Sequence, residues 1–109
     1  MYEQKEIVLI PFPYSDLTGA KLRPALIVYN LLLNETEDRI CCLITSNPTN
    51  DVIEIKKEYF EEGKLPFKSW IKPYRIFTIN KNIIKKRLCR INNNLYSPIL
   101  RKINDYIKS

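Results

Sequence analysis

The first segment whose residues could do chemistry is PYSDLTGAKLRP, residues 13–24, which lies between two apolar runs. Polar loops on a rigid scaffold often carry functional side chains. Those that could bind a substrate here are Tyr14, Asp16, Thr18 and Lys21. Arg23 stands apart because it lies at the entrance to the apolar run 24–28. Its guanidinium must be paired or must face a cleft, so two hypotheses stay open: a salt bridge to Asp16 or Glu6, or an anion site.

A second polar group, Thr45-Ser46-Asn47, follows the apolar residues 41–44 and precedes Pro48. Three consecutive hydrogen-bonding side chains therefore end a strand that is expected to be buried. These three side chains form a second candidate site, in which Ser46 and Asn47 are candidate substrate contacts. The alternative is an ordinary strand-ending turn, since Ser, Asn and Pro are common turn formers.

A third group lies in SWIKPYRIFTI, residues 69–79, where Lys72 and Arg75 alternate with aromatic residues. Aromatic rings can stack on unpaired bases while cations meet phosphates, which is how proteins commonly hold single strands. Lys72 and Arg75 are therefore further candidate substrate contacts. The alternative is that the aromatic residues belong to the core of a strand.

Several other kinds of site lose support. The sequence has three cysteines and no histidine, which leaves too few ligands for zinc and no base for a cysteine dyad. Cys41 and Cys42 are adjacent, so they face opposite sides of a strand, and we expect both to be packing residues. No glycine-rich phosphate loop, HExxH or G-x-S-x-G motif occurs. We expect no metal and no cofactor.

Composition bounds the protein class. A chain of 109 residues fits one domain, here residues 1–109. Its net charge of +6 would attract a polyanion or an acidic protein segment. The alternative is that an AT-rich genome raises the number of Lys codons and so gives the same charge. The odd cysteine count indicates a reducing compartment, so we expect a cytoplasmic protein. The first apolar run is too short for a signal-peptide core or a membrane span.

Apolar runs at 7–12, 22–29 and 39–45 predict strands covered on both sides. Residues 52–55, 69–72 and 75–79 predict shorter strands, separated by YFEEGKLPF, residues 59–67, and by Pro73. Residues 80–88 have helical spacing, with Asn80 as a cap. Leu95, Ile99, Ile103 and Ile107 predict a C-terminal amphipathic helix, with Ser97 or Asn94 as N-cap and Pro98 in its first turn. The expected fold is mainly β with a C-terminal helix, a small antiparallel barrel closed at one mouth by that helix.

These segments, in this order, resemble the MazF/PemK toxin family. The likeness covers nearly the whole chain and rests on EIVLIPF, SDLTGAKLRPALIV, LITSN and IFTINKNIIKKRL, followed by the C-terminal helix. Its most specific part is G-x-K-x-R-P-A-L-I-V combined with a later I-T-S at the end of a buried strand.

The resemblance implies an SH3-like, CcdB-like barrel, a homodimer, and metal-independent cleavage of single-stranded RNA by a toxin that a cognate acidic antitoxin restrains. It also implies that Arg23 and Thr45 are the catalytic pair. Two departures are visible: Lys5 replaces a glycine common in the family, and residues 73–78 lack its usual Gln followed by a basic residue. The alternatives are a CcdB-like toxin that poisons a topoisomerase and an inactive binding module.

Overall fold

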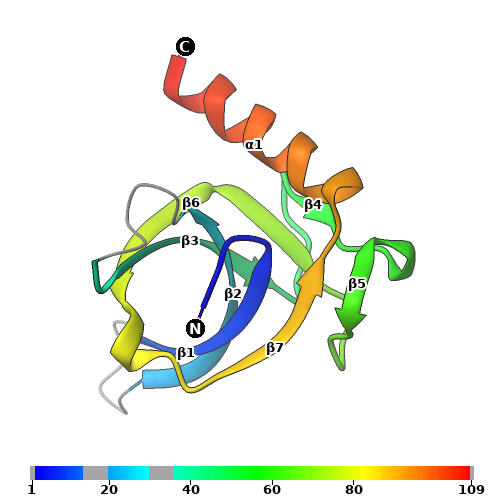
Figure 1. The fold of residues 1–109 in the computed structure, drawn as a ribbon. Helices are drawn as coiled ribbons and strands as arrows, with labels where there is room; N and C mark the ends of the chain where they lie inside the picture. The colour runs from blue at the N-terminus through cyan, green and yellow to red at the C-terminus, as the bar shows by residue number, and fades with distance from the viewer. Residues whose placement is uncertain (1, 14–19, 30–35, 109) are drawn as a thin grey trace.

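The computed structural model describes residues 2–13, 20–29 and 36–108, and its seven strands form a single curved antiparallel sheet, a half-barrel (Figure 1). The strands lie in the order β4-β6-β3-β2-β1-β7-β5. Their bounds are β1 Glu6–Pro13, β2 Ala20–Tyr29, β3 Asp38–Thr45, β4 Ile53–Glu54, β5 Phe60–Gly63, β6 Trp70–Asn80 and β7 Lys86–Ile91. The described residues also form the 3-10 helices η2 Lys57–Tyr59 and η3 Lys81–Ile83 and the helix α1 Asn93–Lys108. The predicted fold class is confirmed.

The three long apolar runs form the centre of the sheet and are covered on both faces, as predicted. Alternate residues of one strand enter two different clusters: Ile7 belongs to the larger cluster, and its neighbour Val8 belongs to the smaller one. Cys42 and Cys41 are divided in the same way. Because successive side chains in a strand point to opposite faces, a run with no polar alternation requires this double cover.

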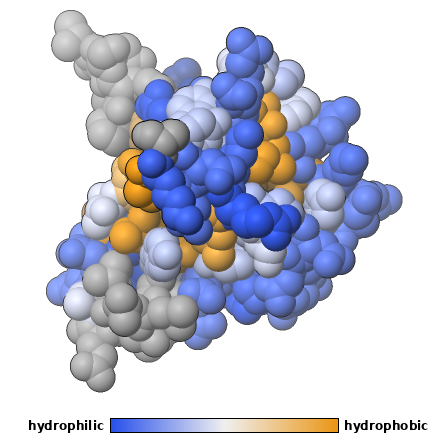
Figure 2. Space-filling model, turned by 90° about the horizontal axis from the view of Figure 1, so that it is seen from above, coloured by the Kyte–Doolittle hydropathy of each residue, from blue (hydrophilic) through white to orange (hydrophobic). Residues whose placement is uncertain are grey.

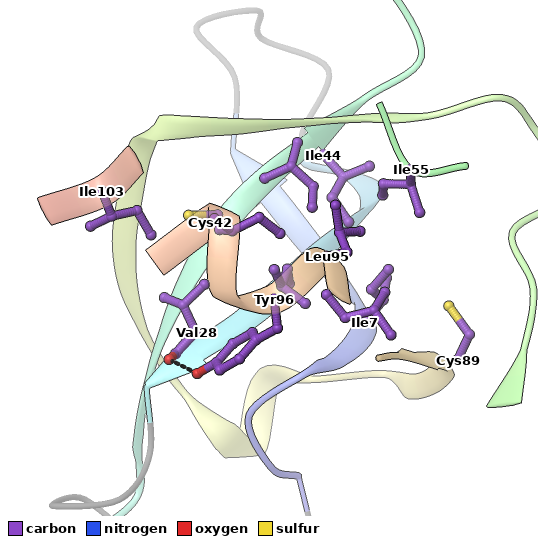
Figure 3. Close-up of a cluster of buried hydrophobic side chains, with 13 residues drawn as sticks. Ile7, Val28, Cys42, Ile44, Ile55, Cys89, Leu95, Tyr96 and Ile103 are labelled. Carbon is purple, nitrogen blue, oxygen red and sulfur yellow. Dashed lines mark hydrogen bonds between the residues drawn. The ribbon is translucent and has the colours of Figure 1, made fainter. Parts of the chain in front are cut away.

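Helix α1 supplies the cover of the larger cluster (Figure 3). Leu95, Tyr96, Ile99 and Ile103 are its buried residues. The Tyr96 hydroxyl donates a hydrogen bond of 2.6 Å to the carbonyl oxygen of Val28 in β2. The same bond can be followed in Figure 3, where the ring of Tyr96 reaches from α1 toward β2. Seen from above, polar side chains cover most of the surface on the side of α1, with apolar patches between them (Figure 2).

The start of α1 differs from the prediction. Its N-cap is Asn92, whose side-chain oxygen accepts from the backbone N–H of Leu95 at 3.3 Å, so neither Ser97 nor Asn94 has this role. The helix therefore begins earlier, and Pro98 lies beyond its first turn. Ile107 is 71% exposed, because the helix outruns the sheet beneath it, so the predicted apolar stripe ends at Ile103.

The helix predicted over residues 80–88 is wrong. Asn80 does act as a cap, but only of the short helix η3, and the chain then enters β7. Strand β7 pairs with β1 on one side and with β5 on the other. Backbone pairing on both edges outweighs local helical spacing, which is a weak preference. Strand β5 lies in a segment for which no strand was predicted.

The prediction that Pro73 separates two strands is wrong, because β6 runs through it without a break. The register against β3 shifts there: Leu43 pairs with Lys72, while Cys42 pairs with Ile76. Three residues of β6 are therefore looped out opposite one step of β3. A proline fits such an irregularity because no ladder hydrogen bond is required of it.

Lys5, which stands where a glycine was expected, has a positive φ of 75°. Its N–H donates to the carbonyl oxygen of Ile27 and its own carbonyl accepts from Ile91 N–H, each at 2.9 Å. These bonds hold a left-handed conformation that glycine adopts more easily than lysine. No helix among the described residues is long and apolar enough to cross a membrane.

Candidate active site at the ends of strands β2 and β3

A pocket of about 480 Å³ lies where β2 begins and β3 ends. Its wall takes consecutive residues from β2, from the end of β3 and from the segment before β6. The lining residues are Leu9, Lys21, Leu22, Arg23, Pro24, Ile44, Thr45, Ser46, Leu65, Pro66, Phe67, Ser69, Lys86 and Leu88. Because neighbouring residues of a strand face opposite ways, the wall includes backbone as well as side-chain atoms. The pocket brings the two predicted catalytic residues together.

The pairing of the strands explains this proximity. Ala25 of β2 pairs with Leu43 of β3, and Arg23 and Thr45 each lie two residues beyond this pair, toward the same end of the sheet. Residues directly opposite in an antiparallel pair share a face of the sheet. Thr45 pairs in turn with Trp70 of β6. Two residues that are 22 positions apart in the sequence therefore line one pocket.

The charge of the pocket has one sign. Its described wall contains three cations, Lys21, Arg23 and Lys86, and no Asp or Glu. Cations gathered in a concave apolar setting attract an anion more strongly than the same charges spread over a flat surface. The pocket is therefore suited to a phosphate group flanked by apolar parts of a ligand.

Arg23 is half-buried and lies opposite Ile10 of β1. One of the two salt bridges considered for it is not formed, because Glu6 has a different partner. Glu6 accepts from Nε of Arg87 at 2.6 Å and from the backbone N–H of Glu3 at 2.8 Å. Asp16, the other partner considered, lies outside the described residues.

Thr45 is 9% exposed, and its hydroxyl closes a turn at the end of β3. Oγ1 accepts from the backbone N–H of Asn47 at 3.1 Å and donates to the carbonyl oxygen of the same residue at 3.3 Å. The strand-ending turn considered from the sequence is thus present. The accepted bond fixes the position of the oxygen, while the donated bond is long and weak.

The remaining predicted residues divide into three groups. Lys21 and Ser46 line the pocket, and both are exposed. Three others do not line the pocket. Asn47 is exposed beside it. Lys72 is half-buried on β6 opposite Leu43, and Arg75 is exposed in the looped-out part of β6. Tyr14, Asp16 and Thr18 lie outside the described residues.

Two contributors to the pocket were missed by reasoning from the sequence. Lys86 was placed in a helix that does not form, and the segment 65–67 was read as a separator between strands. The signal that could have identified the segment is Phe67, a large apolar residue between Pro66 and Lys68 with no strand around it.

The cysteines are poor nucleophiles. Burial raises the pKa of the Cys41 and Cys42 thiols to about 12 and that of Cys89 to about 11. The thiolate, which is the reactive form, is therefore scarce at neutral pH. All three are buried, in keeping with the packing role expected for the adjacent pair.

Comparison with known proteins gives the family. Residues 3–107 match the family model of PemK-like, MazF-like toxins of type II toxin-antitoxin systems. A sequence comparison with curated proteins gives no match.

Solved structures share the fold at low sequence identity. One is a mycobacterial endoribonuclease in complex with its cognate antitoxin, with a TM-score of 0.77 and 15% identity over 98% of this chain and 95% of that chain. MazF in a MazE-MazF structure from Deinococcus radiodurans has a TM-score of 0.75 and 14% identity, with 97% and 95% covered. The Mycobacterium tuberculosis toxin MazF-mt6 has a TM-score of 0.67 and 13% identity, with 92% and 95% covered.

The family match spans nearly the entire chain, and the similar structures share its fold. The chain belongs to the family of PemK-like, MazF-like toxins of type II toxin-antitoxin systems.

Proposed function

We propose that this toxin is a metal-independent endoribonuclease that cleaves single-stranded RNA in the pocket at the ends of β2 and β3. The observation that carries the proposal is that one pocket contains Arg23 and Thr45, with three cations and no carboxylate in its described wall. The endoribonucleases among the similar structures support the same activity.

The reaction that fits such a pocket uses the 2′-hydroxyl of the RNA itself. The 2′-oxygen attacks the adjacent phosphorus, a P–O2′ bond forms, and the P–O5′ bond breaks. Negative charge accumulates on the nonbridging oxygens in the transition state. Arg23 binds two of these oxygens through its forked N–H groups, which suits a phosphate better than a point charge does.

Thr45 contributes a hydrogen bond to the same charge. Its hydroxyl exchanges the long bond to the Asn47 carbonyl oxygen for a nonbridging phosphate oxygen, while the bond from Asn47 N–H continues to hold Oγ1 in place. A donor that is already positioned requires little reorganisation during the reaction. Such donors are worth about 3 to 4 kcal/mol each in the transition state.

Two protons also move: one leaves the 2′-hydroxyl and one joins the 5′-oxygen. Arginine is a poor base, so the acceptor is Asp16 or a water molecule. Among the described residues, no group of three or more Asp, Glu, Cys or His side chains is gathered to hold a metal ion. The proposed chemistry requires none.

Incubation of pure protein with RNA in excess EDTA tests this function. Discrete RNA fragments are expected, and they should be absent when the protein is omitted. A requirement for added magnesium would contradict the proposal. Intact RNA together with inhibition of a topoisomerase would favour the CcdB-like alternative, and intact RNA without such inhibition would favour a binding module.

We further propose that the protein acts as a homodimer and that an acidic antitoxin blocks the RNA site. A two-fold interface would join two shallow sites into one channel. An acidic segment would meet the cations of the pocket and order itself on binding. Sedimentation should show a dimer at micromolar concentration, and the antitoxin complex should not cleave RNA; a monomer, or a complex that cleaves at the full rate, would contradict these two points.

A further inference from the structure

A second pocket, of about 700 Å³, lies next to the first. It is formed by the segments that flank η2 and β5, and four of its lining residues are lysines: Lys56, Lys57, Lys64 and Lys68. We refer to these four lysines and the hollow between them as the lysine cleft. The two pockets share the residues 65–67 as part of their walls.

Half of the positive charge of the lysine cleft is not balanced by a carboxylate in its described wall. Lys68 pairs with Glu54 at 3.5 Å. Lys56, Lys57 and Lys64 form no ion pair within the part of the chain that the structure describes, and all three are exposed. The only other carboxylate in the wall is that of Glu58. The cleft therefore retains an excess of positive charge.

Phe67 stands between the two pockets with 74% of its surface exposed. Its backbone is nevertheless held in place by a hydrogen bond of 2.8 Å, which the Ser69 hydroxyl donates to the Phe67 carbonyl oxygen. Ser69 is only 6% exposed. An exposed ring on a fixed backbone is available to a ligand, and a ligand that covers it gains the free energy of burying apolar surface.

Gly63 turns the chain from β5 into this segment. Its φ is +70°, and an added Cβ would lie 3.0 Å from the carbonyl oxygen of Leu88 and 3.1 Å from Cβ of Cys89. Both the left-handed backbone and the close approach to β7 therefore suit glycine at this position. The segment that carries Lys64 and Phe67 is thus anchored at both ends, by Gly63 and by Ser69.

We propose that the lysine cleft and Phe67 form a second stretch of the RNA-binding path, which holds nucleotides that flank the cleavage site. One base stacks on Phe67 and the following phosphates lie against Lys56, Lys57 and Lys64. This inference rests on the proposed RNA-cleaving function and extends it from one phosphate to several nucleotides.

Single-stranded nucleic acid fits these features better than an acidic protein segment does. Aromatic faces interleaved with cations match the alternation of bases and phosphates along a single strand. An acidic peptide would use the cations but has no regular need for an exposed ring at the junction of two basic pockets. Binding of an acidic protein alone is the competing outcome of the test.

The test uses fluorescent 2′-O-methyl RNA of mixed sequence, 5 and 20 nucleotides long, which lacks the attacking hydroxyl. The cleft variant is Lys56→Gln/Lys57→Gln/Lys64→Gln. The matched control is Arg101→Gln/Lys102→Gln/Lys108→Gln on the exposed side of α1, which removes the same charge. A third variant, Phe67→Leu, keeps an apolar side chain but removes the ring.

The cleft variant should lose about tenfold in affinity for the 20-mer, and the preference for the 20-mer over the 5-mer should shrink by a similar factor. Its salt slope should flatten by about 2, since each lost phosphate contact contributes about 0.7 for a single strand. Phe67→Leu should weaken the 20-mer about fivefold or more. The control should change binding less than twofold.

A cleft variant that binds the 20-mer as the control does would overturn the inference, even if wild-type protein still cleaves RNA. Loss of affinity for an acidic protein segment with unchanged RNA binding would overturn it as well. The opposite pattern, in which wild-type protein binds the 20-mer through the cleft but leaves ordinary RNA intact, would refute the proposed activity and leave the path standing.

Discussion

The pocket at the ends of β2 and β3 that contains Arg23 and Thr45, here called the strand-end pocket, is a neighbour of the lysine cleft. The side chains of the two pockets are held in different ways. Arg23 and Thr45 belong to β2 and β3, at the centre of the sheet, and the Thr45 hydroxyl is fixed by a turn. The lysines of the cleft lie on short segments near the sheet edges, and their side chains are exposed. Chemistry requires atoms held to a fraction of an ångström, whereas attraction of a polyanion requires only charge. Under the proposed function, this difference assigns catalysis to the strand-end pocket and binding to the lysine cleft.

The largest expected effect concerns Arg23. Arg23→Ala should reduce the cleavage rate by about 1,000-fold or more, in the range of arginines that stabilise phosphoryl-transfer transition states. Arg23→Lys should recover little, because an ammonium group lacks the fork. Single-turnover rates and melting temperatures should be measured together, with the exposed Arg101→Ala as control. If Arg23→Ala cleaved RNA at the wild-type rate, the proposed distinction between the two pockets would be wrong.

Thr45→Val should have the next largest effect. It keeps the β-branched shape that suits the end of a strand and removes the hydroxyl, so cleavage should slow by about 100-fold while binding of 2′-O-methyl RNA stays nearly constant. Thr78→Val, at an exposed position of β6, is the matched control. If Thr45→Val weakened RNA binding but left the cleavage rate of bound RNA unchanged, Thr45 would be a binding residue and not a catalytic one.

Gly63→Ala should have a smaller effect that is confined to the cleft side. The positive φ and the 3.0 Å approach to the Leu88 carbonyl oxygen oppose a Cβ, so the free energy of unfolding should fall by about 1 to 2 kcal/mol. Denaturant unfolding measures this loss, and the exposed Arg101→Ala on α1 is the control. Binding of the 20-mer should weaken more than the cleavage rate falls, and an equal loss of both would argue against separate roles.

The smallest expected effect on RNA cleavage at neutral pH is that of Tyr96→Phe, which tests whether the stability of the core that supports both pockets depends on alkaline pH. Burial raises the pKa of Tyr96 to about 12 from an ordinary value of 10.0, and the thiols of Cys41 and Cys42 rise from 9.0 to about 12. Above about pH 9 these groups lose their protons in the unfolded chain but keep them in the folded protein. Deprotonation therefore favours the unfolded state, and the free energy of unfolding falls up to about pH 12. Melting temperatures from pH 7 to 11 should decline, and Tyr96→Phe should decline less steeply above pH 10. An equally steep decline in Tyr96→Phe would assign the effect to other groups.

The sequence was sufficient for the centre of the sheet and insufficient for its edges. The apolar runs that became β1, β2 and β3 are buried on both faces, so their composition alone identifies them. Strand β7 carries Lys86 and Arg87, whose partners are distant in sequence; Arg87, for example, pairs with Glu6 and Glu62. No local pattern records such pairings, so the segment was predicted as a helix.

The candidate site divides in the same way. Arg23 and Thr45 could be singled out because each is a polar residue at the end of an apolar run. Lys86 could not, because its place in the pocket wall depends on the position of β7, which pairs with β1 and β5. Lys5 shows a third case, since the glycine expected there corresponds to a positive φ that the sequence alone does not display.

Analysis of the product ends tests the central claim most directly. Pure protein is incubated in excess EDTA with an RNA and with the same strand fully 2′-O-methylated, and the fragments are identified by mass spectrometry. Attack by the 2′-hydroxyl in the strand-end pocket predicts 2′,3′-cyclic phosphate and 5′-hydroxyl ends from the RNA and no cleavage of the methylated strand. Ends that carry a 5′-phosphate, or cleavage of the methylated strand, would contradict the account.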